Sequence, residues 1–156
     1  MRNILKSVFV LMALLVCVSV AVAADPVVGT WQLNVSKSTF TAGPAVKSQT
    51  RTYSQSGDSI TVVLKSVGVD GKETTTRTTY LFDGKYHPVT GNPDYDGLTA
   101  KRVDANTAEF VLRKDSKTVG TTDRAISKDG KTLTATTKLT AADGQKTENV
   151  LVFDKQ

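Results

Sequence analysis

Hydrophobic and polar residues alternate strictly at the start of a stretch that begins Gly29-Thr30-Trp31-Gln32-Leu33. Trp31, Leu33 and Val35 fall on one face, and the intervening positions are polar. A period of two is typical of a half-buried β-strand. The same pattern returns further along the chain, in three sets of positions that would each share a face: Ile60, Val62 and Leu64; Ala108, Phe110 and Leu112; Leu133, Ala135, Thr137 and Leu139.

Asp-Gly and Gly-Asp pairs separate these segments and predict tight turns. They occur at residues 57–58, 70–71, 83–84, 96–97, 129–130 and 143–144. Glycine adopts positive φ freely, and aspartate bonds nearby amides, so such pairs favour hairpins. The strands predicted between them are 29–35, 47–55, 59–67, 73–82, 84–89, 98–103, 107–114, 117–127, 131–140 and 145–154, with one long loop at 36–46. The pattern predicts an all-β, antiparallel up-and-down barrel of about 8–10 strands.

Residues 1–23 have the pattern of a cleavable signal peptide. Arg2 and Lys6 precede an apolar run, and Ala21-Val22-Ala23 supplies small residues for cleavage after Ala23 or Ala24. The run is short for a membrane span, so we expect no stable membrane insertion after cleavage. We expect a single domain over 24–156, located in the periplasm or secreted.

Charge and cysteine content narrow the possible partners. The chain has 20 basic and 15 acidic residues; loss of Arg2 and Lys6 leaves 18 basic residues and a net charge of +3. The basic residues are scattered without aromatic interleaving, which does not favour nucleic acid. The only cysteine, Cys17, leaves with the predicted leader. Export without disulfides fits a bacterial periplasm or secreted space, and we expect a monomer.

The mature chain resembles small exported bacterial lipocalin-like proteins of the calycin type. The opening Gly29-Thr30-Trp31 is similar to the G-x-W motif of lipocalins and fatty-acid-binding proteins. Further shared segments are 47–53, 83–85 with 88–91, 127–133 and the ending 152–156. The resemblance implies a lipocalin-like or fatty-acid-binding-protein-like barrel. It carries no established activity.

The resemblance also implies two residue-level expectations. In calycins the motif tryptophan packs against an arginine of a late strand, and Arg124 is the candidate for that contact, with Gly29 and Trp31 completing the closure of the barrel base. Fatty-acid-binding proteins hold the ligand carboxylate with an arginine and a tyrosine in the last strand. Those positions are occupied here by Leu151 and Phe153, so that clamp is absent. This departure favours a neutral or amphiphilic ligand, or none.

Two regions hold the candidate ligand-binding residues. The first is the set of strand residues that could face the lumen or its mouth: Arg51, Tyr53, Arg77, Tyr80, Phe110 and Arg113. The second is the polar segment 83–97, with Tyr86 and His87, predicted to be a rim at the open end opposite Trp31. Within it, Asn92, Asp94 and Asp96 match half of a calcium loop, but Val103 stands where the bidentate acid is needed, so an Asx-rich turn is favoured.

No catalytic, metal or cofactor site is predicted. His87 is the only imidazole, and no G-x-S-x-G motif occurs, so we expect no enzyme. The leading hypothesis is an exported barrel that binds a small, partly apolar ligand against Trp31, Leu33, Ile60, Val62, Phe82, Phe110 and Leu133. The alternative is a barrel filled by its own side chains, which acts as an envelope structural or protein-interaction module. A lumen smaller than about 300 Å³ would contradict the ligand-binding hypothesis. A hydrolase using His87 is a third hypothesis.

Overall fold

The computed structural model describes residues 24–41 and 46–156. The predicted signal peptide, residues 1–23, and residues 42–45 lie outside the described part. Within the described ranges, no helix has both the length and the apolar character needed to span a membrane.

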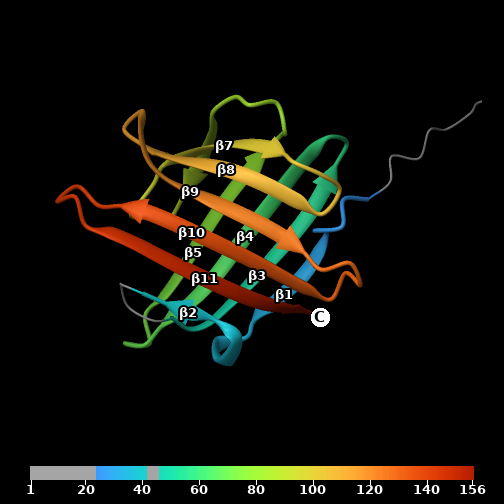
Figure 1. Cartoon of the computed structure of the whole chain (residues 1–156), viewed down its shortest axis with the longest axis horizontal. Helices are drawn as coiled ribbons and strands as arrows, with labels where there is room; N and C mark the ends of the chain where they lie inside the picture. Colours follow the sequence, from blue (N-terminus) through green and yellow to red (C-terminus); the bar gives the residue numbers. More distant parts are fainter. Residues whose placement is uncertain (1–23, 42–45) are drawn as a thin grey trace, which may run out of the picture.

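Ten antiparallel strands form a closed up-and-down barrel, which confirms the predicted fold class (Figure 1). Each strand pairs with the next along the chain, and β11 returns to pair with β1, so that Leu33 lies opposite Phe153. The strands are β1 (Gly29–Leu33), β3 (Val46–Ser56), β4 (Ser59–Gly68), β5 (Glu73–Tyr80), β6 (His87–Thr90), β7 (Gly97–Arg102), β8 (Thr107–Lys114), β9 (Lys117–Ile126), β10 (Thr132–Thr140) and β11 (Lys146–Lys155).

The hairpin turns have the predicted chemistry. At the β9–β10 turn, Asp129 Oδ1 accepts hydrogen bonds from the Lys131 amide and the Ser127 hydroxyl, and Gly130 has φ of +69°. Aspartate satisfies amides that the tight turn leaves unpaired, and glycine takes the left-handed conformation without steric cost. The turn residues therefore determine which strands become neighbours.

The core is the inner face of the barrel, and the predicted alternation accounts for it. Ile60 and Val62, Phe110 and Leu112, and Leu133 and Ala135 are all buried inside. Arg51 and Tyr53 are buried on the same inner face. The chain thus places some charged side chains inward, where they can contact a ligand.

Trp31 closes one end of the barrel, here called the Trp end. Its ring is fully buried, and its Nε1 donates to the Val27 carbonyl oxygen at 2.7 Å. The cation over the ring is Lys155, whose Nζ lies 5.1 Å from the ring centre. Gly29 has φ of +131°, and a Cβ there would lie 3.1 Å from Lys155 Cε. Glycine at this position therefore leaves room for the lysine stem.

The predicted contact between Trp31 and Arg124 is wrong. Arg124 instead directs its guanidinium at Tyr80, Tyr53 and Phe110 inside the barrel. Lys155 stands directly opposite Trp31 in the β1–β11 register and reaches the ring from there.

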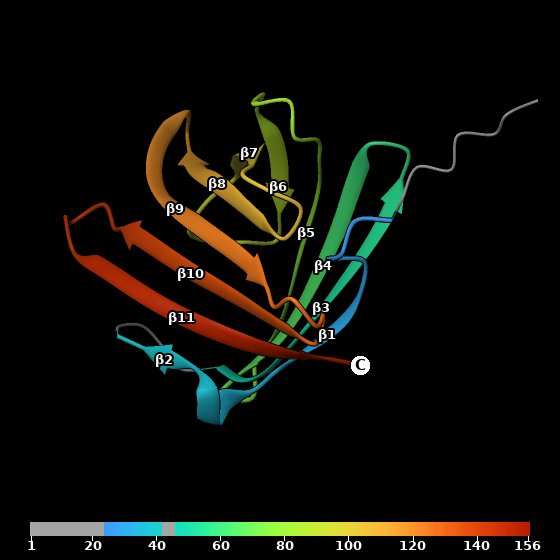
Figure 2. The ribbon, with the colours of Figure 1, turned by 45° about the vertical axis from the view of Figure 1, so that its right-hand side comes forward.

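Three segments differ from the prediction. The expected loop at 36–46 contains a short 3-10 helix, η1 (Val35–Lys37), and the strand β2 (Thr39–Phe40), which pairs with β11 beyond the end of β1 (Figure 2). Because the chain turns at Asn34, Val35 is 47 % exposed and does not continue the buried face of Trp31. The strand expected at 84–89 begins only at His87.

The segment 83–97 is not a single rim at the open end. Residues 81–83 lie at the Trp end, where Phe82 stacks under Arg102, which pairs with Asp25. Strand β6 then crosses the barrel wall, and only residues 91–96 lie at the opposite end. The strand within the segment separates its two halves.

Candidate ligand site in the barrel lumen

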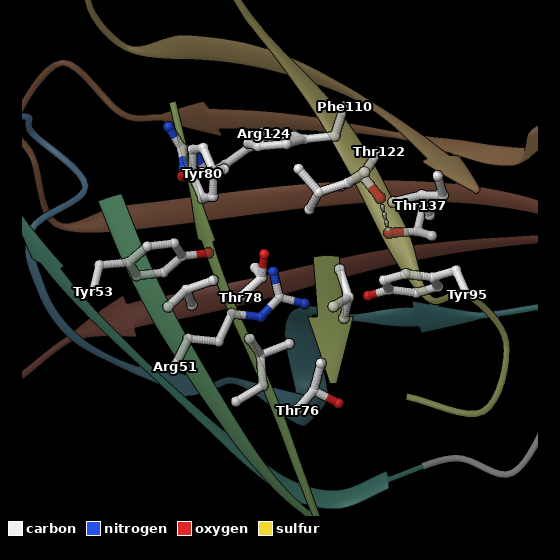
Figure 3. Close-up of a pocket in the computed structure, with 15 residues that line it drawn as sticks. Arg51, Tyr53, Thr76, Thr78, Tyr80, Tyr95, Phe110, Thr122, Arg124 and Thr137 are labelled. Atoms are coloured by element: carbon white, nitrogen blue, oxygen red, sulfur yellow. Dashed lines mark hydrogen bonds between the residues drawn. The ribbon is translucent and has the colours of Figure 1, made fainter. Parts of the chain in front are cut away.

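A small cavity lies in the centre of the barrel, between side chains from eight strands and from the 91–96 segment (Figure 3). Its volume is about 80 Å³. Aliphatic and aromatic side chains form part of the wall, and arginine, tyrosine and threonine side chains form the rest. The lining residues are Arg51, Tyr53, Val62, Leu64, Thr76, Thr78, Tyr80, Val89, Tyr95, Leu98, Phe110, Leu112, Thr122, Arg124 and Thr137.

Arg124 is the more deeply buried of the two lumen arginines, at 3 % exposure. Its Nη1 donates to Tyr80 Oη at 2.7 Å, and its guanidinium carbon lies 5.3 Å from the Phe110 ring centre. Its Nε has no hydrogen-bond partner among the described residues. Burial lowers the pKa of this guanidinium, but the oxygens of Tyr80 and Tyr53 outweigh that effect and raise it. Arg124 therefore stays cationic.

Arg51 is held by a polar and an aromatic neighbour. Its Nε donates to Gln49 Oε1 at 2.9 Å, and its guanidinium carbon lies 4.3 Å from the Phe153 ring centre. Gln49 is itself fixed by a 2.8 Å hydrogen bond to Ser66. These contacts use Nε and one face of the guanidinium, and they direct its end toward the middle of the cavity (Figure 3).

Three tyrosines add hydroxyl groups to the same space. Tyr53 and Tyr95 point their hydroxyls inward from opposite sides, and Tyr80 lies beside Arg124 (Figure 3). Burial raises the pKa of Tyr80 and of Tyr95, although Arg124 and Arg51, respectively, oppose the shift. Both phenols are therefore neutral at physiological pH and can donate hydrogen bonds.

No carboxylate balances the two lumen arginines. Among residues 24–41 and 46–156, no Asp or Glu lies within ion-pair distance of Arg51 or Arg124. The buried carboxylate of Asp25 contributes only weakly to the field at Arg124, and it pairs with Arg102 at the Trp end. The cavity is thus electropositive and rich in donors.

The structure places four of the predicted ligand-binding residues around the cavity: Arg51, Tyr53, Tyr80 and Phe110. Their binding role itself stays a prediction. Arg77 is exposed on the outer face, since Thr76 and Thr78 on either side of it point inward. Of the predicted apolar lining, Val62 and Phe110 reach the cavity, whereas Trp31 and Leu133 pack outside its lining.

Arg113 and Tyr86 also lie outside the lumen. Arg113 stands opposite Gly97, and the Tyr86 ring covers Gly97 so closely that a Cβ there would lie 2.0 Å from a ring carbon. The Tyr86 hydroxyl donates to the Asp96 carbonyl oxygen at 3.0 Å. This outer contact corrects the prediction that Tyr86 belongs to the mouth, and the half-buried Arg113 is not among the residues that line the cavity.

His87 lies at the Trp end, away from the cavity lining. Its Nε2 lies 2.8 Å from Asp83 Oδ1 and 3.3 Å from the Leu81 amide nitrogen. On the opposite side of β6, Asn92 Oδ1 accepts from the amides of Asp94 and Tyr95. The predicted Asx turn is therefore present. Its hydrogen bond to the Tyr95 amide orients the Tyr95 side chain into the lumen.

Tyr95 and Arg124 are the tyrosine and the arginine of the lumen that the sequence interpretation did not assign to the ligand site. Arg124 precedes Ile126 by two positions, so a buried Ile126 would have placed Arg124 on the inner face. Tyr95 has no such signal, because it follows a turn and not a strand.

Two further hollows lie on the described surface. One, of about 520 Å³, is at the Trp end beside Pro26, Phe82 and Arg102. The other, of about 510 Å³, borders β9, β10 and β11 near Leu139 and Thr147. The Arg102 charge in the first hollow already has a carboxylate partner, so the central cavity is the better candidate site.

No family model matches the sequence, and no curated protein matches it. A solved structure described as the siderocalin Ex-FABP, which functions through dual ligand specificities, is 13 % identical, with a TM-score of 0.38. The match covers 84 % of this chain and 74 % of that one. A likeness of this size assigns no ligand and no family.

Proposed function

We propose that this protein is an exported, non-catalytic barrel that binds a small molecule in its lumen. The observation that carries the proposal is the composition of the cavity wall. Val62, Leu98 and Phe110 provide apolar surface, while Arg51 and Arg124 provide buried donors. Ligand sites combine these features, because apolar contacts supply affinity and a few fixed polar groups supply orientation.

The cavity volume limits the ligand. Sites for drug-sized molecules occupy about 300–1,000 Å³, whereas this cavity has about 80 Å³. The volume therefore contradicts binding of the ligand expected from the sequence, and the molecule proposed here is more compact. The same volume favours the second candidate, a barrel filled by its own side chains that acts through its outer surface as a structural or interaction module.

Native mass spectrometry of protein purified gently from the producing cells tests the two candidates. We expect an adduct of constant small mass that is lost at high collision energy. Val89→Phe should abolish the adduct, because Val89 is buried and lines the cavity. Thr90→Phe is the matched control, because Thr90 lies on the exposed outer face of the same strand.

The measurement has clear outcomes. Thermal unfolding of both variants shows whether the barrel remains folded. Loss of the adduct in the folded Val89→Phe variant alone supports lumen binding. A bare polypeptide mass for the unsubstituted protein, or an adduct that persists in both variants, contradicts it in favour of the filled barrel.

A further inference from the structure

We infer that the lumen selects a compact organic anion, a carboxylate of a few heavy atoms, which Arg51 and Arg124 bind together with the lumen tyrosines. The inference rests on the proposed function and adds the chemical class of the ligand. The last-strand clamp expected of fatty-acid-binding proteins is absent, and these donors come from β3, β5, β9 and the 91–96 segment instead.

The first step is the unbalanced charge. Two guanidinium groups line one cavity, and Arg124 is 3 % and Arg51 9 % exposed. Removing a cation from water costs free energy that a paired anion offsets. Within the described residues, hydrogen bonds and aromatic faces are their contacts, and no carboxylate pairs with either. A bound anion would supply the missing charge.

The second step concerns the direction of the hydrogen bonds. Arg124 donates to Tyr80 Oη, which leaves the Tyr80 proton free to be donated. A hydroxyl that accepts from a cation becomes a stronger donor, because hydrogen bonds in a chain polarise one another. The Arg51 charge acts on the Tyr95 hydroxyl through space and opposes the rise in the Tyr95 pKa that burial causes. The cavity therefore presents hydrogen-bond donors. A carboxylate, which accepts hydrogen bonds, matches these donors, whereas a ligand group that itself donates does not.

The threonines support this polarity. Thr76 and Thr78 donate their hydroxyl protons to the carbonyl oxygens of Gly91 and Pro88, and Thr122 bonds Thr137. The hydroxyl protons of Thr76 and Thr78, and one proton of the Thr122–Thr137 pair, are thus used at the wall. The arginine and tyrosine groups remain as the principal donors for a ligand.

The third step is size. A cavity needs about 10–15 Å³ to hold one water molecule, and a cavity of about 150 Å³ holds benzene. The lumen cavity, at about 80 Å³, has roughly half the volume of the benzene-binding cavity. A short carboxylate fits, whereas the chain of a long fatty acid does not.

Isothermal titration calorimetry with matched ligands tests the inference. The series is acetate, butyrate and hexanoate, each compared with its neutral amide of nearly equal shape. We expect at least one short carboxylate to bind, and its amide to bind at least tenfold more weakly. Arg51→Gln should reduce carboxylate affinity at least tenfold and leave amide affinity nearly unchanged.

The control is Arg77→Gln, which removes an arginine from the outer face of β5. It should leave carboxylate affinity unchanged. Tyr95→Phe provides a second lumen variant that preserves side-chain shape, with an expected loss of severalfold. Circular dichroism and thermal unfolding establish which variants are folded, and Tyr95→Phe alone decides the matter if Arg51→Gln does not fold.

The failures of the two proposals are distinguishable. Equal binding of amides and carboxylates, blocked by Val89→Phe, would overturn the anion inference and leave lumen binding intact. Carboxylate binding unaffected by the folded lumen variants would also overturn it. Absence of binding by every ligand, together with a bare native mass, would overturn lumen binding itself.

Discussion

Arg124 and Tyr80 form a buried pair in which the guanidinium Nη1 donates to the phenol oxygen at 2.7 Å. The pair joins β9 to β5 across the interior, between strands that are not neighbours in the sheet. The Tyr80 ring also meets Phe82 and Phe110 edge to face, with centroids 5.5 and 5.3 Å apart. Polar and aromatic contacts therefore fix the same side chain, and this fixed unit forms one wall of the cavity.

Tyr80→Phe should reduce the free energy of unfolding by about 1.5–3 kcal/mol, because it removes a buried hydrogen bond to a charged group and retains the ring. Urea denaturation followed by circular dichroism measures the change. Tyr86→Phe is the control: the Tyr86 hydroxyl also donates a hydrogen bond, but the side chain is 49 % exposed. Equal losses of unfolding free energy in the two variants would contradict a stabilising role for the hydrogen bond between Arg124 and Tyr80.

The barrel could be predicted from the sequence because turn chemistry and alternation agree along most of it. The strands around Ile60 and Leu133 have one apolar face, and that face is inside. Where both faces are polar, as at Arg77 and Arg124, alternation alone does not say which side chain is inward. The last buried residues of those strands are Tyr80 and Ile126. Once they are known to be buried, the alternation shows that Arg124 faces inward and Arg77 outward.

The tertiary contacts of the site were beyond sequence reasoning for a further reason. Lys155 meets Trp31 because the closing strand pair puts them opposite each other, a register that no local pattern specifies. Tyr95 enters the lumen because an Asx turn orients it. In each case a long-range pairing or a turn decided the position of the side chain.

Trp31→Ala should lower the free energy of unfolding by about 3–5 kcal/mol, since it removes a fully buried ring and leaves a cavity. Lys155→Met keeps the aliphatic stem that lies beside Gly29 and removes the cation over the ring, so a loss of only about 0.5–1 kcal/mol is expected. Val35→Ala, at a 47 % exposed position, is the control. Denaturation curves that coincide for the Trp31 and Val35 variants would contradict the closure role of Trp31.

Gly97 and Tyr86 should be energetically coupled. Gly97→Ala places a methyl group about where the Tyr86 ring now lies, so we expect a loss of about 1–3 kcal/mol from overpacking. In a Tyr86→Ala background the same substitution should cost much less. A double-mutant cycle of unfolding free energies measures the coupling. Additive losses would show that the ring moves aside without cost.

Acid should destabilise the protein through its turn aspartates. Hydrogen bonds from Ser127 and then Lys131 hold the pKa of Asp129 below its usual 3.8. A lowered folded-state pKa contributes stability that is complete above the unfolded value and is lost as the pH falls through the folded one. The urea concentration at the midpoint of unfolding should therefore decrease as the pH is lowered below about 4. Asp129→Asn should flatten this fall, and Ser127→Ala should raise the Asp129 pKa in an NMR titration; an unchanged pKa would contradict the assigned cause.

Strand β6 should be the weakest part of the barrel wall. It pairs with β5 only at Arg77–Thr90 and Thr78–Val89, and Pro88 has no amide to donate. Local opening requires little free energy where few backbone hydrogen bonds must break. Hydrogen–deuterium exchange should therefore be faster at Val89 and Thr90 than at the paired amides of β3 and β4. Because Val89 lines the cavity, a short carboxylate that binds there should slow exchange in β6 and leave exchange in β3 and β4 unchanged. Equal protection of β3, β4 and β6 would contradict the prediction that β6 is the weakest part of the wall.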